Sequence, residues 1–298
     1  MQGLLNRQEA RRGMERIQGP TKDVLLDELC WGLRLFQRCG HSAHPDRVSD
    51  SALRLFWLFL EALDSVDELM RAGLVEPAAI QARTMLDVGL QLLYVVKRND
   101  ERVAAAYTTS IRRRSLKAAQ LLTKGGEMRR ELAAIAKKTH HLPDGFVDRF
   151  RDTAAEAKRI KATLSSPDWK EANDELERLK DPDRWFKAFG GPQNLPELAR
   201  FVGLELWVRV FTNQWNGITH GLGGGRVFRP GAEGGVVPAP LRSPGAWEAL
   251  LDTTHSLNVL VFRAMIARFR EGEDPAFLQW LDSDVLPRFP KPNRAGKV

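Results

Sequence analysis

The chain has 298 residues, of which 43% are hydrophobic and 28% charged, a composition that excludes a wholly disordered protein. Its formal net charge of +7 favours polyanionic partners, but the basic residues are scattered along the chain and equally fit a solvated surface. The two cysteines, Cys30 and Cys39, fit neither a disulfide framework nor a zinc pattern. We expect them to behave as small apolar residues in a reducing compartment.

Residues 1–20 are polar and rich in arginine, without the apolar segment of a secretory signal, and we expect a flexible N-terminal lead. The longest apolar stretches, 53–63 and 85–96, are too short and too interrupted to span a bilayer. These features predict a cytoplasmic protein with no membrane partner.

Apolar residues recur at helical spacing through the first half of the chain and predict helices over about residues 22–39, 51–72, 78–97 and 100–122. Asp50 or Ser51 is the expected N-cap of the second helix. The third helix is apolar around most of its circumference, which is typical of a central element. Its polar exceptions, Arg83 and Asp87, lie one turn apart. They predict either an internal ion pair that fixes helix packing or a pair that faces a polar pocket.

The middle of the chain is more polar. We expect residues 123–182 to form a helical excursion from a single domain that spans 21–286, followed by a flexible tail at 287–298.

Two more core helices are expected, over about residues 196–219 and 245–271. The Gly/Pro-rich segment 221–245 between them has room for no more than a short β-hairpin. The fold class that we predict is therefore all-α: a single multi-helix bundle domain with a helical excursion and a Gly/Pro-rich loop before the last long helix.

Motifs for metals and cofactors are weak. The glycines of 221–225 follow a helix rather than a strand and lack the Lys-Ser/Thr of a phosphate loop. The adjacent His140 and His141 point in different directions and make a poor metal site. We expect no cofactor and no metal.

One polar cluster stands at the end of the helix that follows Arg209. Asn213, Asn216 and His220 are spaced by three and four residues, so they lie on one helical face. His220 falls at the negative end of the helix dipole, where an imidazole can titrate near neutral pH. The cluster either caps the helix or supplies an acid–base histidine assisted by amides.

Three motifs occur in an order that resembles an uncharacterised bacterial helical domain family with Arg-Ser-Leu-Leu-Glu, Trp-Gly/Ser-Gly and Val-His-Gly motifs. The resemblance covers roughly residues 24–270. The motifs read here Arg83-Thr-Met-Leu-Asp87, then Trp185 followed by Gly190-Gly-Pro, then Asn216 followed by Thr219-His-Gly221.

The helical make-up and the Arg…His-Gly ending are also similar to the HEPN superfamily of nucleotide-binding and RNA-cleaving domains, many of them in toxin–antitoxin or anti-phage systems. This resemblance implies a metal-independent endoribonuclease or toxin-type defence effector, acting as a homodimer or with a partner protein from such an operon. His220 would take the 2′-hydroxyl proton, Asn216 would position phosphate, and Arg83, beside Asp87, or Arg209 would stabilise the phosphorane.

The arginine expected seven residues before His220 is Asn213 in this chain, which puts the catalytic cation in doubt. The alternative is a non-catalytic helical domain that binds a protein, a nucleotide or RNA. The expected RNA- or nucleotide-binding residues are Asn213, Arg112, Arg113, Arg114 and Arg226.

Overall fold

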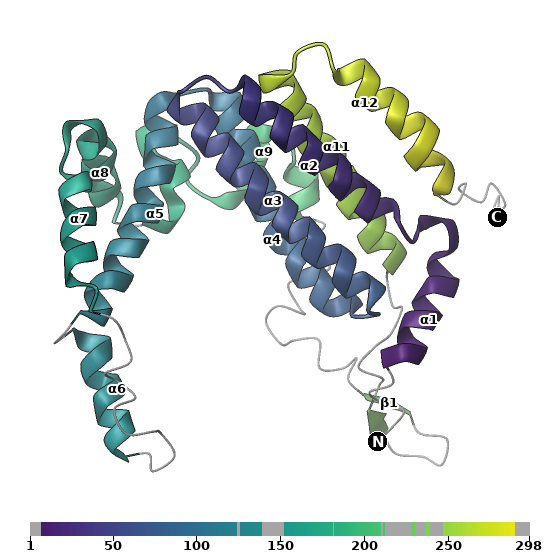
Figure 1. Ribbon diagram of the computed structural model, residues 1–298, viewed down its shortest axis with the longest axis horizontal. Helices are drawn as coiled ribbons and strands as arrows, with labels where there is room; N and C mark the ends of the chain where they lie inside the picture. The colour runs from purple at the N-terminus through teal and green to yellow at the C-terminus, as the bar shows by residue number, and fades with distance from the viewer. Residues whose placement is uncertain are drawn as a thin grey trace. The chain divides into compact units, whose positions relative to one another are not determined.

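A computed structural model describes residues 7–123, 126–138, 152–180, 182–209, 211, 228–230, 236–238 and 247–289. The secondary-structure elements of the described residues are helices apart from one short hairpin, so the all-α prediction is confirmed (Figure 1). The chain divides into unit 1, Met1–Lys97 with Pro196–Val298, and unit 2, Arg98–Leu195. Among the described helices, none has the length and apolarity that crossing a membrane requires.

Unit 1 is built on long helices whose apolar faces meet in one core. Its α-helices are α1 (Arg7–Gln18), α2 (Val24–Ser42), α3 (Arg47–Arg71), α4 (Val75–Arg98), α9 (Leu195–Val202), α11 (Trp247–Phe269) and α12 (Asp274–Trp280). Shorter 3₁₀ and π turns are η2 (Gly19–Thr21), η6 (Leu281–Val285) and η7 (Leu286–Arg288). The predicted central helix is α4, which has eleven buried residues.

Two glycines bring the helices of unit 1 close together. A Cβ added to Gly32 of α2 would lie 2.6 Å from Leu60 of α3 and 2.8 Å from Phe262 of α11. A Cβ on Gly89 of α4 would lie 3.3 Å from the ring of Phe59. Side chains of the neighbouring helices pack directly against the helix backbone at these points, because neither glycine has a side chain to keep them away.

The start of α3 differs from the prediction. Asp46, not Asp50 or Ser51, is the N-cap, and its carboxylate accepts a hydrogen bond from the Ser49 N–H at 2.6 Å. The helix therefore begins a full turn earlier, because this carboxylate satisfies one of the free N–H groups of the first turn.

The expected flexible lead contains helix α1, because Met14 is 2% exposed and gives this segment a place against unit 1. The helix expected over 196–219 stops at Val202. Gly203 has a φ of +86°, and the Leu204 N–H donates to the Ala199 carbonyl at 2.7 Å, which closes the helix with a left-handed turn. The chain is helical again over 205–209.

A two-stranded antiparallel hairpin lies in the Gly/Pro-rich segment, as predicted. It joins β1 (Phe228–Pro230) to β2 (Val236–Pro238), with Arg229 opposite Val237.

Unit 2 comprises α5 (Glu101–Leu122), α6 (Glu127–Lys138), α7 (Ala154–Leu164), α8 (Pro167–Leu179) and η4 (Pro182–Gly190). Asp100 caps α5 by accepting from the Arg102 N–H at 2.9 Å. Trp185 is 1% exposed and packs edge-on against Tyr107 of α5, with ring centroids 5.1 Å apart. The compact unit thus begins at Arg98 rather than at the residue 123 expected for the excursion, because α5 packs against α7, α8 and η4.

Candidate functional site

The three consecutive arginines of α5 point to three different neighbours. Successive residues of a helix lie roughly 100° apart around its axis, so a run of three cannot share one face. The Arg112 guanidinium lies over the Trp169 ring, 3.7 Å from its centroid. The Arg114 Nε donates to the Asp183 carboxylate at 2.7 Å. Both arginines therefore hold α5 to its neighbours.

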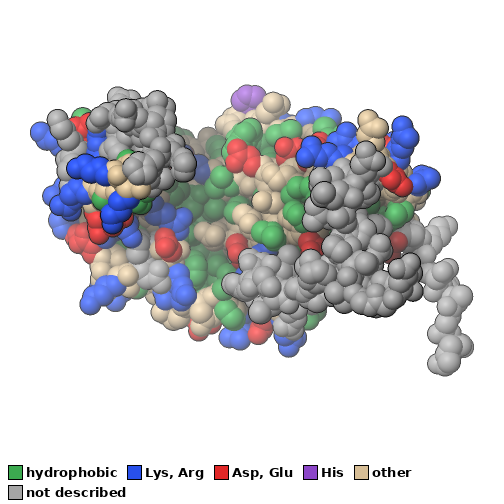
Figure 2. All heavy atoms as spheres, turned by 90° about the horizontal axis from the view of Figure 1, so that it is seen from below, with side chains coloured by type: hydrophobic (Ala, Val, Ile, Leu, Met, Phe, Trp, Pro, Cys, Tyr) green, Lys and Arg blue, Asp and Glu red, His purple; other side chains and the backbone are tan. Residues whose placement is uncertain are grey.

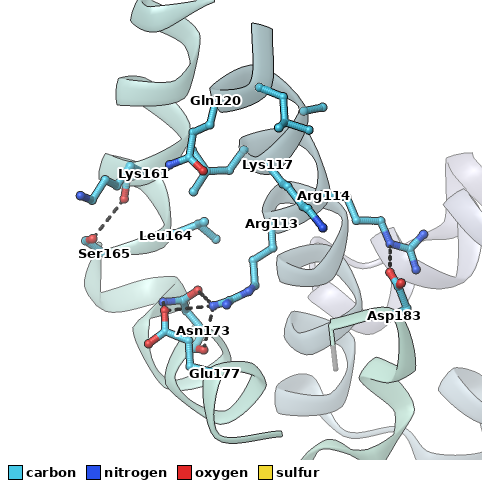
Figure 3. Close-up of a pocket in the computed structure, with 13 residues that line it drawn as sticks. Arg113, Arg114, Lys117, Gln120, Lys161, Leu164, Ser165, Asn173, Glu177 and Asp183 are labelled. Atoms are coloured by element: carbon cyan, nitrogen blue, oxygen red, sulfur yellow. Dashed lines mark hydrogen bonds and ion pairs between the residues drawn. The ribbon is translucent and has the colours of Figure 1, made fainter. Parts of the chain in front are cut away.

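Arg113 reaches across to α8 (Figure 3). Its Nη1 donates to Asn173 Oδ1 at 2.7 Å and to Glu177 Oε1 at 3.0 Å. The Asn173 amide also donates to Glu177 Oε1 at 3.2 Å. This three-membered network fixes the Arg113 side chain along the wall of a pocket.

The pocket has a volume of about 620 Å³ and lies among α5, α7, α8 and η4. Its charged lining residues are Arg113, Arg114, Lys117, Lys161, Glu177 and Asp183. The two carboxylates are each paired with an arginine, so their charges cancel. Within the described part of the chain, neither Lys117 nor Lys161 has a hydrogen bond or ion pair from its ammonium group. The pocket therefore has two uncompensated positive charges.

Other lining residues add apolar surface and an amide. Leu116, Leu121 and Leu164 line the cavity, and Leu164 is 4% exposed. Gln120 on α5 brings one amide donor and one acceptor, and Lys161 lies across from it on α7 (Figure 3). The cavity can accordingly contact both an anionic group and a flat apolar one.

The charge of the whole chain is concentrated in the unit that contains this pocket. Unit 2 has 21 Lys and Arg against 15 Asp and Glu, so it accounts for six of the seven net positive charges. Lysine and arginine side chains gather over α6 and α7, at the left of Figure 2. The basic residues themselves are scattered, as expected, since 24 of the 45 lie in unit 1, but 23 acidic residues there leave unit 1 close to neutral.

Arg83 and Asp87 form an ion pair along α4, with Arg83 Nη2 3.3 Å from Asp87 Oδ1. Burial raises the pKa of the Asp87 carboxyl, and Arg83 opposes that rise. The Asp87 side chain is 40% exposed, yet this Oδ1 atom is shielded from solvent. The geometry is that of a helix-surface pair with one buried oxygen.

Most of the other site residues predicted from the sequence lie in the segment after Arg209. Asn213, Asn216, His220 and Arg226 lie outside the described residues. Arg209 is described and is exposed on the helical stretch 205–209.

A buried polar network was missed by the sequence analysis. The Glu28 side chain on α2 is 1% exposed and contacts His255 Nδ1 on α11. Asn258 Nδ2 donates to the other Glu28 oxygen at 2.5 Å. The His255 ring packs against Phe289 with centroids 4.8 Å apart. The signal was present, because Glu28 falls at the helical spacing of the apolar residues around it, where a charged residue requires an internal partner.

Comparison with known proteins gives one match. Residues 50–225, more than half of the chain, match a family described as a family of unknown function (DUF5677). No curated protein and no solved structure matches the chain. The resemblance to an uncharacterised helical family is thereby confirmed: this chain belongs to the family of unknown function DUF5677.

Proposed function

We propose that this protein is a non-catalytic helical binding or sensor domain, and that the pocket of unit 2 binds a phosphorylated small ligand of the nucleotide class. The observation that supports this most directly is the pair Lys117 and Lys161, two cations without described partners in a pocket whose other charges cancel. A phosphate monoester carries about −1.5 to −2 charges near neutral pH, which matches two ammonium groups.

The size and lining of the pocket support the same ligand class. Its volume of about 620 Å³ falls within the range of roughly 300–1,000 Å³ that is usual for small-molecule sites. The leucine side chains offer a surface for a base, and Gln120 offers a donor and an acceptor for its edge. Arg113 and Arg114 are already paired with the carboxylates of Glu177 and Asp183. In this proposal they therefore hold the helices of the pocket in position.

The test is calorimetric titration of the full chain with adenosine and guanosine mono-, di- and triphosphates, with inorganic phosphate for comparison. Lys117→Ala and Lys161→Ala should each weaken nucleotide binding roughly tenfold, in line with the loss of about 1.4 kcal/mol of charge-assisted contact. Lys158→Ala is the matched control, because Lys158 is an exposed lysine of α7 outside the pocket lining. It should leave the affinity within about twofold, which corresponds to the modest effect of a distant surface charge.

Equal weakening by all three substitutions would mean general charge attraction and would overturn the pocket assignment. A short single-stranded RNA that binds where no mononucleotide does would also overturn it, in favour of an RNA partner.

HEPN-like, metal-independent RNA cleavage, with a toxin-type or anti-phage role and an operon partner, stays a prediction from the sequence. Its histidine and both asparagines lie outside the described residues. Incubation of the protein with total RNA, with and without divalent metal, tests it independently of the pocket. RNA cleavage by the wild type that is lost in His220→Ala would support the nuclease prediction. RNA left intact by the wild type would contradict it.

A further inference from the structure

A second pocket lies in unit 1, among α1, η2 and α3, and has a volume of about 280 Å³. All of its lining residues are polar: Arg11, Glu15, Gln18, Lys22, Glu68 and Arg71. The first three recur at i, i+4 and i+7 of α1, so they reach the pocket from one helical face. This lining favours a charged ligand, because an apolar group would strip water from the polar side chains without replacing the lost hydrogen bonds.

The Gln18 side chain indicates a ligand that forms hydrogen bonds. Gln18 is only 6% exposed, and its carbonyl is fixed by a hydrogen bond from the Thr21 hydroxyl at 2.7 Å. Within the part of the chain that the structure describes, no residue forms a hydrogen bond with its side-chain amide. A buried amide without a hydrogen bond destabilises a folded protein, so we expect this amide to serve a ligand.

Arg71 contributes a second donor to the same pocket. Its Nε donates to the Asp67 carboxylate at 2.7 Å, and its Nη1 donates to Asp23 at 3.0 Å. Its Nη2 atom is buried and has no hydrogen bond to any residue that the structure describes. Two carboxylates therefore hold the guanidinium in one orientation and leave one of its nitrogens to donate. A guanidinium fixed in this way is well suited to bind a carboxylate.

The other four charges of the pocket are of both signs and are not paired with one another. Arg11 and Lys22 are cations, and Glu15 and Glu68 are carboxylates. Between 7 and 123 and in the other described ranges, no residue forms an ion pair with any of these four side chains. Opposite charges that line one pocket separately are complementary to a ligand that itself has both signs.

We propose that this pocket binds a free α-amino acid with a polar side chain. Its carboxylate accepts hydrogen bonds from Arg71 Nη2 and from the Gln18 amide, and its ammonium group donates to Glu15 and Glu68. The volume lies just below the range of roughly 300–1,000 Å³ that is usual for drug-sized ligands, so it suits a smaller molecule. The site is separate from the nucleotide pocket, whose lining residues all belong to unit 2.

The test begins with thermal melts of the full chain in each of the twenty standard L-amino acids, because a ligand of the native state raises the melting temperature. Calorimetric titration then measures the affinity of those that do. Gln18→Met removes the amide and keeps a side chain of similar length. Without ligand it should melt at or above the wild-type temperature, yet it should bind the amino acid at least roughly tenfold more weakly.

Two further variants make the result independent of the buried position. Glu68→Gln changes only an exposed side chain and should also weaken binding roughly tenfold, through loss of the contact with the ammonium group. Arg16→Ala is the matched control, because Arg16 is an exposed residue of α1 that does not line the pocket. It should leave the affinity within about twofold.

Analogues of the amino acid that binds most tightly test whether both of its charges are recognised. For L-serine these are ethanolamine, which lacks the carboxylate, and 3-hydroxypropanoate, which lacks the ammonium group. Each analogue should bind at least roughly tenfold more weakly than the amino acid.

Four results would overturn the proposal. They are no binding of any amino acid up to about 10 mM, equal binding of an analogue, equal weakening by Arg16→Ala, and unchanged affinity in Gln18→Met. A Gln18→Met protein that melts well below the wild type would also overturn it, because the amide would then have a partner within the fold.

Discussion

The close approach of α2 to its neighbours can be tested with a single methyl group at Gly32. The added Cβ of Gly32→Ala would lie 2.6 Å from Leu60 Cδ2 and 2.8 Å from Phe262 Cζ, both buried atoms. Overpacking of this kind costs about 1–3 kcal/mol. Alanine also has a better helix propensity than glycine by about 1 kcal/mol. The net expectation is a loss of roughly 0–2 kcal/mol in the free energy of unfolding.

Gly40 provides the control within the same helix. No atom lies within 4 Å of a Cβ built there, so Gly40→Ala should gain up to about 1 kcal/mol from propensity alone. The two substitutions should differ by about 1–3 kcal/mol, which is the cost of the contact. Urea unfolding followed by far-UV circular dichroism measures the difference. If Gly32→Ala is as stable as Gly40→Ala, the close packing of α2 against α3 and α11 is refuted.

Three further predictions concern buried and paired groups. Glu28→Ala should lower the free energy of unfolding by about 3–5 kcal/mol in denaturant titration, because it leaves the buried His255 and Asn258 of α11 unpaired. Glu28→Gln keeps the shape of the side chain and should lower the free energy of unfolding by less. In the native protein a thiol reagent should modify only Cys30, which is exposed, because burial raises the pKa of the Cys39 thiol to about 12. Both thiols should react after unfolding. Rapid reaction of both thiols in the native protein would contradict the burial of Cys39. The hydrogen bond from Arg178 lowers the pKa of Glu175 to about 2, so the stability it contributes to unit 2 is present above its ordinary pKa of 4.5 and is lost as the pH falls toward 2. Thermal melts across that range should show this loss in the wild type and a smaller loss in Glu175→Gln.

Most helices were predictable because periodic apolar residues report burial directly. The expected positions of the first four long helices and of the one over 245–271 agree with the structure, whereas the helix expected over 196–219 stops at Val202. Their ends depend on single side chains. Asp46 takes the cap of α3 although Asp50 and Ser51 are equally suitable residue types, so only the backbone path selects among them. Gly203 ends α9 with a left-handed turn, whereas Gly89 is accommodated inside α4. A glycine has both uses, and the choice depends on tertiary packing.

The pocket was harder to predict than the helices, because the conspicuous arginines of the sequence are already engaged with neighbouring side chains. Three arginines in a row make the segment 112–114 conspicuous, yet each meets a different acceptor or ring and stabilises the unit. The charges left over belong to Lys117 and Lys161, which are on different helices and both line the pocket because α5 packs against α7. Summing charge over residues 98–195 would have identified the basic unit from the sequence, but not the two lysines. A charged site is defined by the charges that internal pairing does not cancel, and that pairing is a property of the fold.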